Sequence, residues 1–426
     1  MLSTLRNAWK VPDLRKRLLF TFLMVAIFRL GNNILVPGID TAALKNFTSS
    51  GTLFGFYDLI SGGAFSKFSI FAMGVIPYIN ASIVMQLLTI AIPQLEQLSK
   101  EGEDGRKKIQ NYTRYAAVAF GLLQAFSSYV IIYNARALTN PSDKLTVFLI
   151  MITVTTGSIF LMWLGDQITA KGIGNGISLL VFINIISRIP FQFSQIATLQ
   201  TTEAVNIVEV VIFIAVVLVL LVAVIIMSLA ERRIPVQYAG KTVGNKSFRG
   251  QTTHIPINLN NSGVIAIIFA MSVMQFPATL AQFWPTSKVA IAITQGKFSP
   301  FKESSIQYSL IYFLLILFFT WFYTQITFKP DEMSENMHKS SGFIPGIRPG
   351  DYTAKYIEKV LTKVSFIGGV FAGVIAVFPI IIKGYTNFGG LQFGGTSLLI
   401  VVGVALDTLR QMESQLVMRH YQGFLK

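Results

Sequence analysis

The chain contains no cysteine and few charged residues, and both absences narrow its possible functions. Without cysteine there can be no disulfide and no thiol chemistry, although the redox compartment stays open. Charged residues make up only 13% of the 426 residues, whereas soluble domains carry about 25%. Hydrophobic residues make up 52% of the chain and its mean hydropathy is +0.58. We therefore expect lipid, rather than water, to surround most of this protein.

Residues that carry catalysis are also scarce. The three histidines, His254, His338 and His420, lie far apart in polar stretches, which argues against a histidine metal cluster. The apolar segments contain no aspartate pair and no histidine, and no GxxxxGK[ST] loop that would bind nucleotide phosphates is present. We expect no cofactor and no enzyme activity, so a partner has to supply any driving force.

Long apolar segments are abundant. A membrane-spanning helix needs about 20 mainly apolar residues. Ten segments are candidates, of which the fifth and the tenth are short: 18–35, 70–92, 112–133, 146–165, 176–190, 207–230, 263–283, 306–327, 361–382 and 394–409. The first could open a signal peptide, but without a small-residue cleavage site after it we favour a retained helix. The predicted fold is an all-α, polytopic membrane protein whose termini lie on one side.

Lysine and arginine predict which side that is. The N-terminus, the even-numbered connections and the tail carry 24 basic residues, with Arg114 at the start of the third span counted among them. The odd-numbered connections carry nine, with Arg188 at the end of the fifth span counted among them. Because cytoplasmic loops are enriched in basic residues, both termini are predicted to be cytoplasmic. Much of the net charge of +15 then reflects topology and does not imply nucleic-acid binding.

Two connections on that side, 231–262 and 327–359, are too long to be simple turns. Their Pro and Gly residues, and the alternating pattern from Arg233 to Tyr238, predict ordered, hairpin-like projections. Solvated loops without a partner are the alternative. We favour docking surfaces, since long loops in compact proteins are usually functional or disordered and these are not of low complexity.

Some segments are broken or poorly matched to a membrane. Residues 55–67 precede the second apolar run but are interrupted by Gly62-Gly63 and carry Asp58 and Ser61, so they are too polar to face lipid. Pro77 and Pro277 lie inside the second and seventh predicted spans, where proline tends to kink a helix. Interrupted spans are tolerated where they line a cavity or are buried in protein.

A short duplication suggests internal symmetry. The tripeptide 74–76 (Gly-Val-Ile) begins the apolar part of the second span, and 263–265 (Gly-Val-Ile) begins the seventh. Five spans separate the copies, so they would run in opposite directions across the membrane, as inverted repeats do. A match of three residues is weak alone.

Longer motifs make the pattern specific. The chain resembles the SecY family, the central subunits of bacterial protein-conducting channels, along essentially its whole length. The resemblance rests on these stretches in order: SGGAFSKFSIFAMGVIPYINASIVMQLL (61–88), EGEDGRKKIQNYTRY (101–115), MWLGDQITAKGIGNGISLL (162–180), TTHIPINLN (252–260), FPATLA (276–281), SGFIPGIRPGDYTAKYIEKV (341–360) and GGTSLLIVVGVALD (394–407). It implies two pseudo-symmetric five-helix halves, 1–190 and 191–426, around an hourglass pore.

The resemblance also implies the parts of a gate. The pore constriction would be a ring of branched aliphatic residues: Val75, Ile79, Ile177, Val181, Ile268 and Ile400. The family usually has isoleucine at most of these positions, so the two valines here would leave the ring slightly wider or differently packed. Such a ring can close around any polypeptide because it makes no directional bonds, and it excludes ions by dewetting. Packing in an ordinary helical core is the alternative.

Residues 55–67 would then form a short plug helix that folds back from the external side and seals the funnel beneath the ring. Its core would consist of Phe56, Tyr57, Asp58, Leu59, Ile60, Ser61, Gly62, Gly63 and Ala64. The two glycines would supply the backbone freedom for displacement, and the second helix would begin near Ile70.

The remaining implied sites concern partners. A lateral gate would release apolar signal sequences into membrane lipid. It would lie between spans 2 and 3 on one side and spans 7 and 8 on the other, and would include Ile83, Phe276 and Pro277. The two long cytoplasmic loops, with Arg348, Arg249, Arg232 and Arg233, would dock the ribosome or the SecA motor ATPase. The resemblance further implies SecE and SecG as membrane partners, unfolded precursor polypeptides as substrates, and the bacterial cytoplasmic membrane as location.

Two other function classes stay open at this stage. An ion-coupled secondary transporter with inverted repeats would need acids inside the spans, and the span interiors nearly lack them. A membrane scaffold or receptor without a pore would show no change in conductance when the ring is mutated.

Overall fold

The structure is a computed structural model. It describes residues 6, 9–40, 58, 61–134, 137–138, 143–201, 206–238, 242–243, 246–247, 252–260, 263–283, 287, 301, 305–385 and 394–423. Its long helices, taken in chain order, are α2 (Pro12–Gly31), α5 (Ile76–Ala91), α7 (Glu103–Asn134), α8 (Lys144–Lys171), α9 (Gly176–Thr201), α10 (Ile207–Leu229), α11 (Gly263–Phe283), α13 (Ile306–Phe328), α15 (Asp351–Tyr385) and α16 (Gly395–Gly423). Two shorter helices, α6 (Pro93–Lys100) and α14 (Pro330–Lys339), lie in connections.

A helix overlaps each of the ten apolar ranges predicted from the sequence. α10 shows why: it is rich in β-branched valine and isoleucine, yet it is helical, because in lipid a segment must satisfy its own backbone hydrogen bonds. By length and composition alone, five of the described helices are apolar enough to cross a membrane: α8, α9, α10, α13 and α15. α5 and α6 pass the same test as a pair, bent by 100° at Ile92.

Several predicted boundaries are wrong. The fifth and tenth segments are not short, because α9 continues through Pro190 to Thr201 and α16 continues to Gly423. The second helix begins at Ile76 rather than near Ile70, and residues 70–75 form turns. Pro77 therefore lies in the first turn of α5, where its missing N–H costs no hydrogen bond, and it does not kink the helix.

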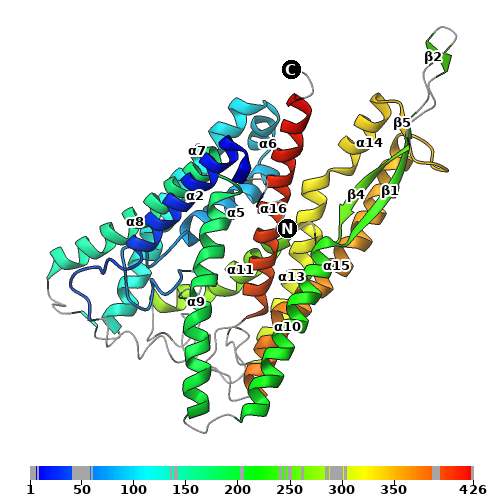
Figure 1. Cartoon of the computed structure of the whole chain (residues 1–426). Helices are drawn as coiled ribbons and strands as arrows, with labels where there is room; N and C mark the ends of the chain where they lie inside the picture. Colours follow the sequence, from blue (N-terminus) through cyan, green and yellow to red (C-terminus); the bar gives the residue numbers. More distant parts are fainter. Residues whose placement is uncertain are drawn as a thin grey trace.

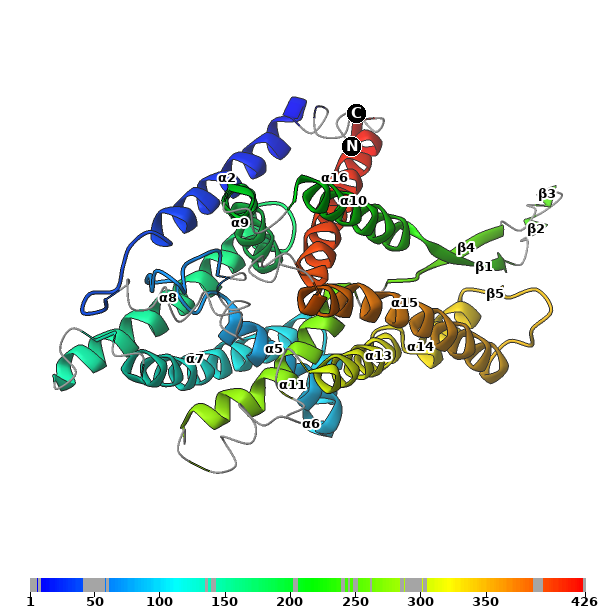
Figure 2. The ribbon, with the colours of Figure 1, turned by 90° about the horizontal axis from the view of Figure 1, so that it is seen from below.

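The helices pack into one bundle with two sides (Figure 1). Figure 2 shows α2, α7 and α8 on one side and α10, α13 and α15 on the other, with α5, α11 and α16 between them. One apolar core belongs to the second side and comprises residues of α10, α11, α13, α15 and α16 around Tyr312 and Ile316. α7 contacts α5, α8 and α11, and α5 also contacts α8.

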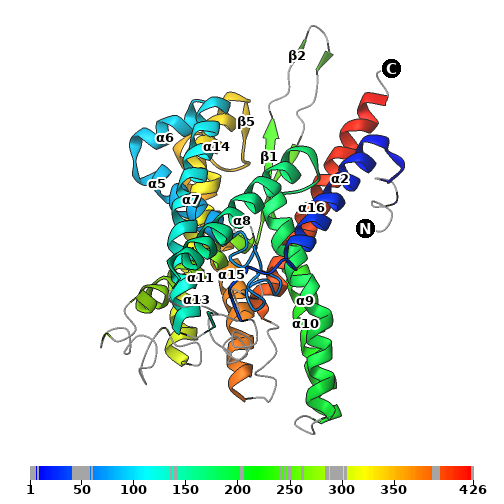
Figure 3. The same ribbon diagram turned by 90° about the vertical axis from the view of Figure 1, so that its left-hand side faces the viewer.

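The connection 231–262 is a projecting β-hairpin, as predicted. β1 (Glu231–Tyr238) pairs antiparallel with β4 (Thr252–Asn258), and the short strands β2 (Thr242–Val243) and β3 (Lys246–Ser247) pair nearer the tip. The connection 327–359 differs from the prediction, because it forms helix α14 and only a two-residue strand, β5 (Gly342–Phe343), which pairs with β1. Figures 1 and 3 both show the hairpin, α14, α6 and the C-terminal end of α16 at the same end of the molecule.

Candidate functional site

Five of the six predicted ring residues meet in one apolar cluster. Val75 precedes α5, Val181 lies on α9 and Ile400 on α16, and these three side chains are 1–4% exposed. Ile79 of α5 and Ile177 of α9 are half-buried and pack against the same cluster. Ile268 of α11 is half-buried but does not belong to this cluster. Side chains from three segments, far apart in the sequence, thus converge on one apolar contact.

This cluster, which we call the ring cluster, joins the two predicted halves of the chain. Its members before residue 190 include Phe71, Leu164 and Leu180, while Ile400 and Val404 come from α16. Val264, from the second copy of the short duplication, packs against the same cluster as Val75 from the first copy. The contact consists of aliphatic and aromatic side chains, so no directional bond holds it closed.

The predicted plug lies beside the ring cluster and is held by polar contacts. Asp58 is helical, whereas residues 61–67 of the predicted short helix form turns, because Gly62 and Gly63 have φ values of 67° and 90°, in the left-handed region. Of the other predicted plug residues, Asp58, Ser61 and Ala64 are only 1–2% exposed. Phe56, Tyr57, Leu59 and Ile60 lie outside the described residues.

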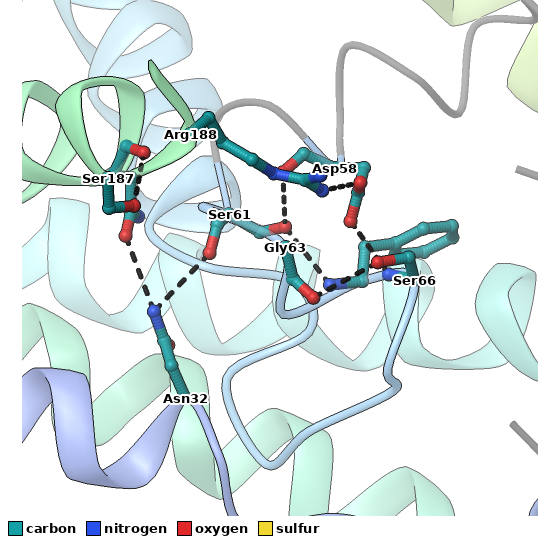
Figure 4. Close-up of polar contacts among 9 residues, drawn as sticks. Asn32, Asp58, Ser61, Gly63, Ser66, Ser187 and Arg188 are labelled. Carbon is teal, nitrogen blue, oxygen red and sulfur yellow. Dashed lines mark hydrogen bonds and ion pairs between the residues drawn. The ribbon is translucent and has the colours of Figure 1, made fainter. Parts of the chain in front are cut away.

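An ion pair anchors this segment to α9. The guanidinium of Arg188 contacts the Asp58 carboxylate and also donates from Nη2 to the Asp58 backbone oxygen, at 3.4 Å (Figure 4). The side chains are 12% and 3% exposed, respectively. The second Asp58 oxygen accepts a hydrogen bond from the Ser66 backbone N–H at 2.8 Å. Asp58 thus links the turn that contains the two glycines to α9.

A buried asparagine connects the same segment to α2. Asn32, directly after α2, donates from Nδ2 to the Ser61 backbone oxygen at 3.5 Å and to Oδ1 of Asn184 at 3.4 Å. The Asn184 side chain also lies so close to Gly62 that a Cβ there would come within 2.4 Å of Oδ1. Gly62 is therefore required both by its positive φ and by this close approach. We call Asp58, residues 61–67 and their partners Asn32, Asn184 and Arg188 the plug seat.

The predicted lateral gate is a contact between α5 and α11. Ile83 of α5 packs against the apolar core that contains α11, α13 and α16. Asn80 of α5 accepts a hydrogen bond from the Ser272 hydroxyl of α11 through Oδ1, at 3.1 Å. Pro277 lies half-buried inside α11, whereas the side chain of Phe276 lies outside the described residues.

The loop that carries Arg348 is a tight and exposed turn. Gly346 and Gly350 flank it with φ values of 80° and 95°, and the Arg348 side chain is exposed. Thr353 donates to the Arg348 backbone oxygen at 2.9 Å, and Ser334 of α14 donates to the Gly350 oxygen at 2.8 Å. These bonds hold the backbone of the loop while the guanidinium points to solvent.

The two long connections form a single unit. Ile234, Val236 and Ile257 of the hairpin pack with Met337 and Ile344 of the second connection and with α15. Arg232 and Arg233 of β1 are both exposed, on opposite faces of the strand, and Arg233 pairs with Glu231 at 2.6 Å. On α14, the neighbouring Lys339 donates to Glu335 and lowers the pKa of that carboxyl. Arg249 lies outside the described residues.

Sequence reasoning missed the polar partners inside the bundle, namely Asn32, Asn184, Arg188, Asn80 and Ser272. The available signal was a polar side chain within an otherwise apolar helix, since such groups are costly in a membrane unless they face a partner. The sequence cannot say which residues pair, because the partners lie up to 192 positions apart. Within the described residues, no group of three or more histidines and acids is arranged to hold a metal ion.

Comparison with known proteins places this arrangement in a known group. The family model described as SecY matches residues 69–409. The "Protein translocase subunit SecY" of Halalkalibacterium halodurans is 42% identical over all of both chains, and that of Thermotoga maritima is 41% identical over all of this chain and 98% of its own. Among solved structures, "The structure of a protein conducting channel" has a TM-score of 0.66 at 17% identity and covers 96% of both chains.

Two further structures share the fold at the same identity and coverage, 17% and 96% of both chains. One is described as "The plug domain of the SecY protein stablizes the closed state of the translocation channel and maintains a membrane seal", with a TM-score of 0.64. The other is described as "Sec61 in the Canine ribosome-channel complex from the endoplasmic reticulum", with a TM-score of 0.60. At this level of identity the structures support the fold.

Proposed function

Because the chain belongs to the SecY family, we propose that it forms a gated protein-conducting channel in the bacterial cytoplasmic membrane. The channel passes unfolded polypeptides across the membrane and releases apolar segments sideways into lipid. The ring cluster is the observation that carries this proposal. Val75, Ile79, Ile177, Val181 and Ile400 form an apolar contact between two sets of helices, and such a contact can separate and close again around any sequence.

The proposed topology has ten spans in two halves, 1–190 and 191–426, with both termini in the cytoplasm. The clustering of the hairpin, α14, α6 and the end of α16 at one end of the molecule supports it (Figure 3). These elements belong to even-numbered connections or to the tail, which carry most of the lysine and arginine. The charges and the folded connections thus favour the same cytoplasmic end.

The proposed gate has three parts. The ring cluster closes the pore, the plug seat holds Asp58 and residues 61–67 next to it, and the α5–α11 contact with Ile83, Asn80, Ser272 and Pro277 opens toward lipid. An entering apolar signal helix can replace the contacts of Ile83, because lipid and apolar side chains compete on nearly equal terms. Ile268, although outside the cluster, lies on α11 and completes the ring when the halves move.

The proposed docking surface is the unit of hairpin, α14 and the Arg348 loop. An exposed arginine on a rigid turn suits an RNA phosphate or a carboxylate, since the guanidinium can donate two parallel hydrogen bonds. We propose the ribosome and the SecA motor as the alternate occupants, with Arg232, Arg233 and Arg249 adding positive charge along the hairpin. SecE and SecG are the proposed membrane partners.

Reconstitution tests the channel function directly. Purified protein in vesicles with its membrane partners, the motor, ATP and a secretory precursor is expected to protect the precursor from added protease. Omission of ATP is expected to abolish that protection. Uptake of small solutes driven by an ion gradient, without protection of the precursor, would instead indicate a secondary transporter.

The docking surface is tested by Arg348→Glu. Reversing this exposed charge leaves the fold intact, because the loop is held by backbone hydrogen bonds, but it repels phosphate and carboxylate groups. We expect motor-driven translocation to fall by about 10- to 100-fold, in line with a lost charge-assisted contact at an interface. The matched control is Lys107→Glu, an exposed reversal on α7, which should keep most of the activity. Equal translocation by both variants contradicts the role of Arg348.

A further inference from the structure

We propose that Arg188 of α9 is a positioning residue that seats the plug, through its buried ion pair with Asp58, and that it ties the plug to the N-terminal half. This inference rests on the proposed channel function and adds to it a specific fastening for the resting state. Breaking the pair releases Asp58 and residues 61–67 without altering the ring cluster.

The geometry supports a fastening and not an incidental surface contact. Arg188 reaches both the carboxylate and the backbone oxygen of Asp58 (Figure 4). Its guanidinium carbon lies 5.6 Å from the ring centre of Phe191. The phenylalanine face holds the cation in place while the carboxylate compensates its charge. The Arg188 Nε has no hydrogen-bond partner within the part of the chain that the structure describes, so Asp58 is its main compensation there.

Because the Asp58–Arg188 pair is buried, losing one partner costs more than losing both. Removing one partner of a buried ion pair leaves an uncompensated charge, whereas removing both is often tolerated. Asp58 also accepts from the backbone of Ser66, so its carboxylate orders the turn that carries Gly62 and Gly63. Loss of Arg188 therefore loosens the whole seat and not a single side chain.

The plug seat is attached to only one of the two proposed halves, because all its partners belong to that half. Asn32 directly follows α2, and Asn184 and Arg188 lie on α9. All three residues belong to the proposed N-terminal half, 1–190. The ring cluster, in contrast, takes Ile400 and Val264 from the C-terminal half. When the halves separate, the seat can stay assembled on the N-terminal half until the Asp58–Arg188 pair itself breaks.

Plug position can be measured at Ala64, which is 1% exposed. The chain has no cysteine, so Ala64→Cys introduces a single thiol, and cysteine-free partner subunits keep it the only one in the complex. We expect a membrane-impermeant maleimide, added from the external side, to label this thiol slowly in the resting channel. Adding Arg188→Gln should accelerate labelling by about tenfold, since an unpaired buried carboxylate favours the displaced plug.

Three variants distinguish a specific role of the Asp58–Arg188 ion pair from a general loosening of the fold. Arg188→Lys keeps the charge but cannot reach both Asp58 oxygens, so it should restore slow labelling in part. Asp58→Asn with Arg188→Gln should label no faster than either single variant. Lys144→Gln, an exposed charge loss at the start of α8, should label like the parent. Additive acceleration in the double variant, or parent-like labelling of Arg188→Gln, overturns the proposal.

Ion conductance and protease protection distinguish failure of the Arg188 role from failure of the channel function. In vesicles that contain the full complex, Ile400→Asn should leak ions if the pore exists, whatever the role of Arg188. Arg188→Gln should leak as well, and to a smaller extent, because its ring cluster stays closed. A leak with Ile400→Asn and none with Arg188→Gln overturns the role of Arg188 alone. No leak with Ile400→Asn overturns the ring assignment, and failure of the parent complex to protect a precursor from protease overturns the channel function.

Discussion

The ring cluster and the plug seat lie side by side but are held together by opposite kinds of force. The ring cluster is apolar and joins both halves of the chain, through residues such as Val75 and Ile400. The plug seat is polar and joins segments of one half, through Asp58, Arg188 and Asn32. Apolar contacts are insensitive to the identity of their partner, whereas a buried ion pair tolerates only its own partner.

This difference assigns the two regions different tasks. A contact without directional bonds can close around a passing polypeptide of any sequence, so the ring suits the moving part of the pore. A seat with directional bonds has one arrangement, so it suits the part that must return to the same place after each opening. Substitutions that place a polar group in the ring cluster, or that remove a polar contact elsewhere in the proposed gate, test this difference.

The largest effect is expected where a polar group enters the apolar region. Ile400→Asn places an amide in a site that is 1% exposed, and an unsatisfied buried amide costs about 1–3 kcal/mol in addition to the lost apolar contact. We expect the resting ion leak to rise by about 100-fold and precursors with defective signals to be accepted. Conductance of single complexes in a planar bilayer measures the first effect.

Ile268→Asn is the matched comparison, because Ile268 is only half-buried and lies outside the ring cluster. It should leak far less than Ile400→Asn in the resting state. An equal leak from both variants would place Ile268 in the closed ring. A parent-like leak from Ile400→Asn would remove the ring assignment.

A smaller effect is expected at the contact between α5 and α11. Ser272→Ala removes the 3.1 Å hydrogen bond to Asn80, which is worth about 0.5–1.5 kcal/mol. Because this bond links the two sides of the proposed lateral gate, we expect about fivefold faster translocation of a precursor with a weakened signal sequence. Ser365→Ala is the control, since that buried hydroxyl donates within its own helix to the Thr362 oxygen. Similar rates for both variants would count against the gate contact.

The smallest effect is expected at the second contact of the plug seat. Asn32→Ala removes two long hydrogen bonds, of 3.4 and 3.5 Å, and also removes an Oδ1 that has no partner among the described residues. The stability lost with the two hydrogen bonds is partly offset by the removal of the unpaired oxygen. Labelling of Ala64→Cys should therefore accelerate by only about two- to threefold. Labelling as fast as in Arg188→Gln would show that the uncharged bonds, and not the ion pair, hold the plug.

Sequence reasoning performed well for the spans and poorly for their internal contacts. The ten apolar ranges each coincide with a helix, and the projecting hairpin follows from the alternation around Ile234 and Val236. The late start of the second helix was missed, because the apolar run from Ile70 to Val75 looks the same in a turn as in a helix. The plug helix was expected from the family resemblance; Asp58 is helical, but positive φ values at Gly62 and Gly63 place residues 61–67 in turns.

The sequence by itself determined the number and placement of the apolar segments, the excess of basic residues in one set of connections, and the family motifs. These properties are local, since hydropathy and charge are read residue by residue and a long apolar segment that faces lipid has to satisfy its own backbone hydrogen bonds as a helix. Only the tertiary structure decided that Arg188 meets Asp58, that Asn80 meets Ser272, and that Ile268 stands apart from Ile400. Pairing between distant residues depends on how the helices pack, and no single segment contains that information.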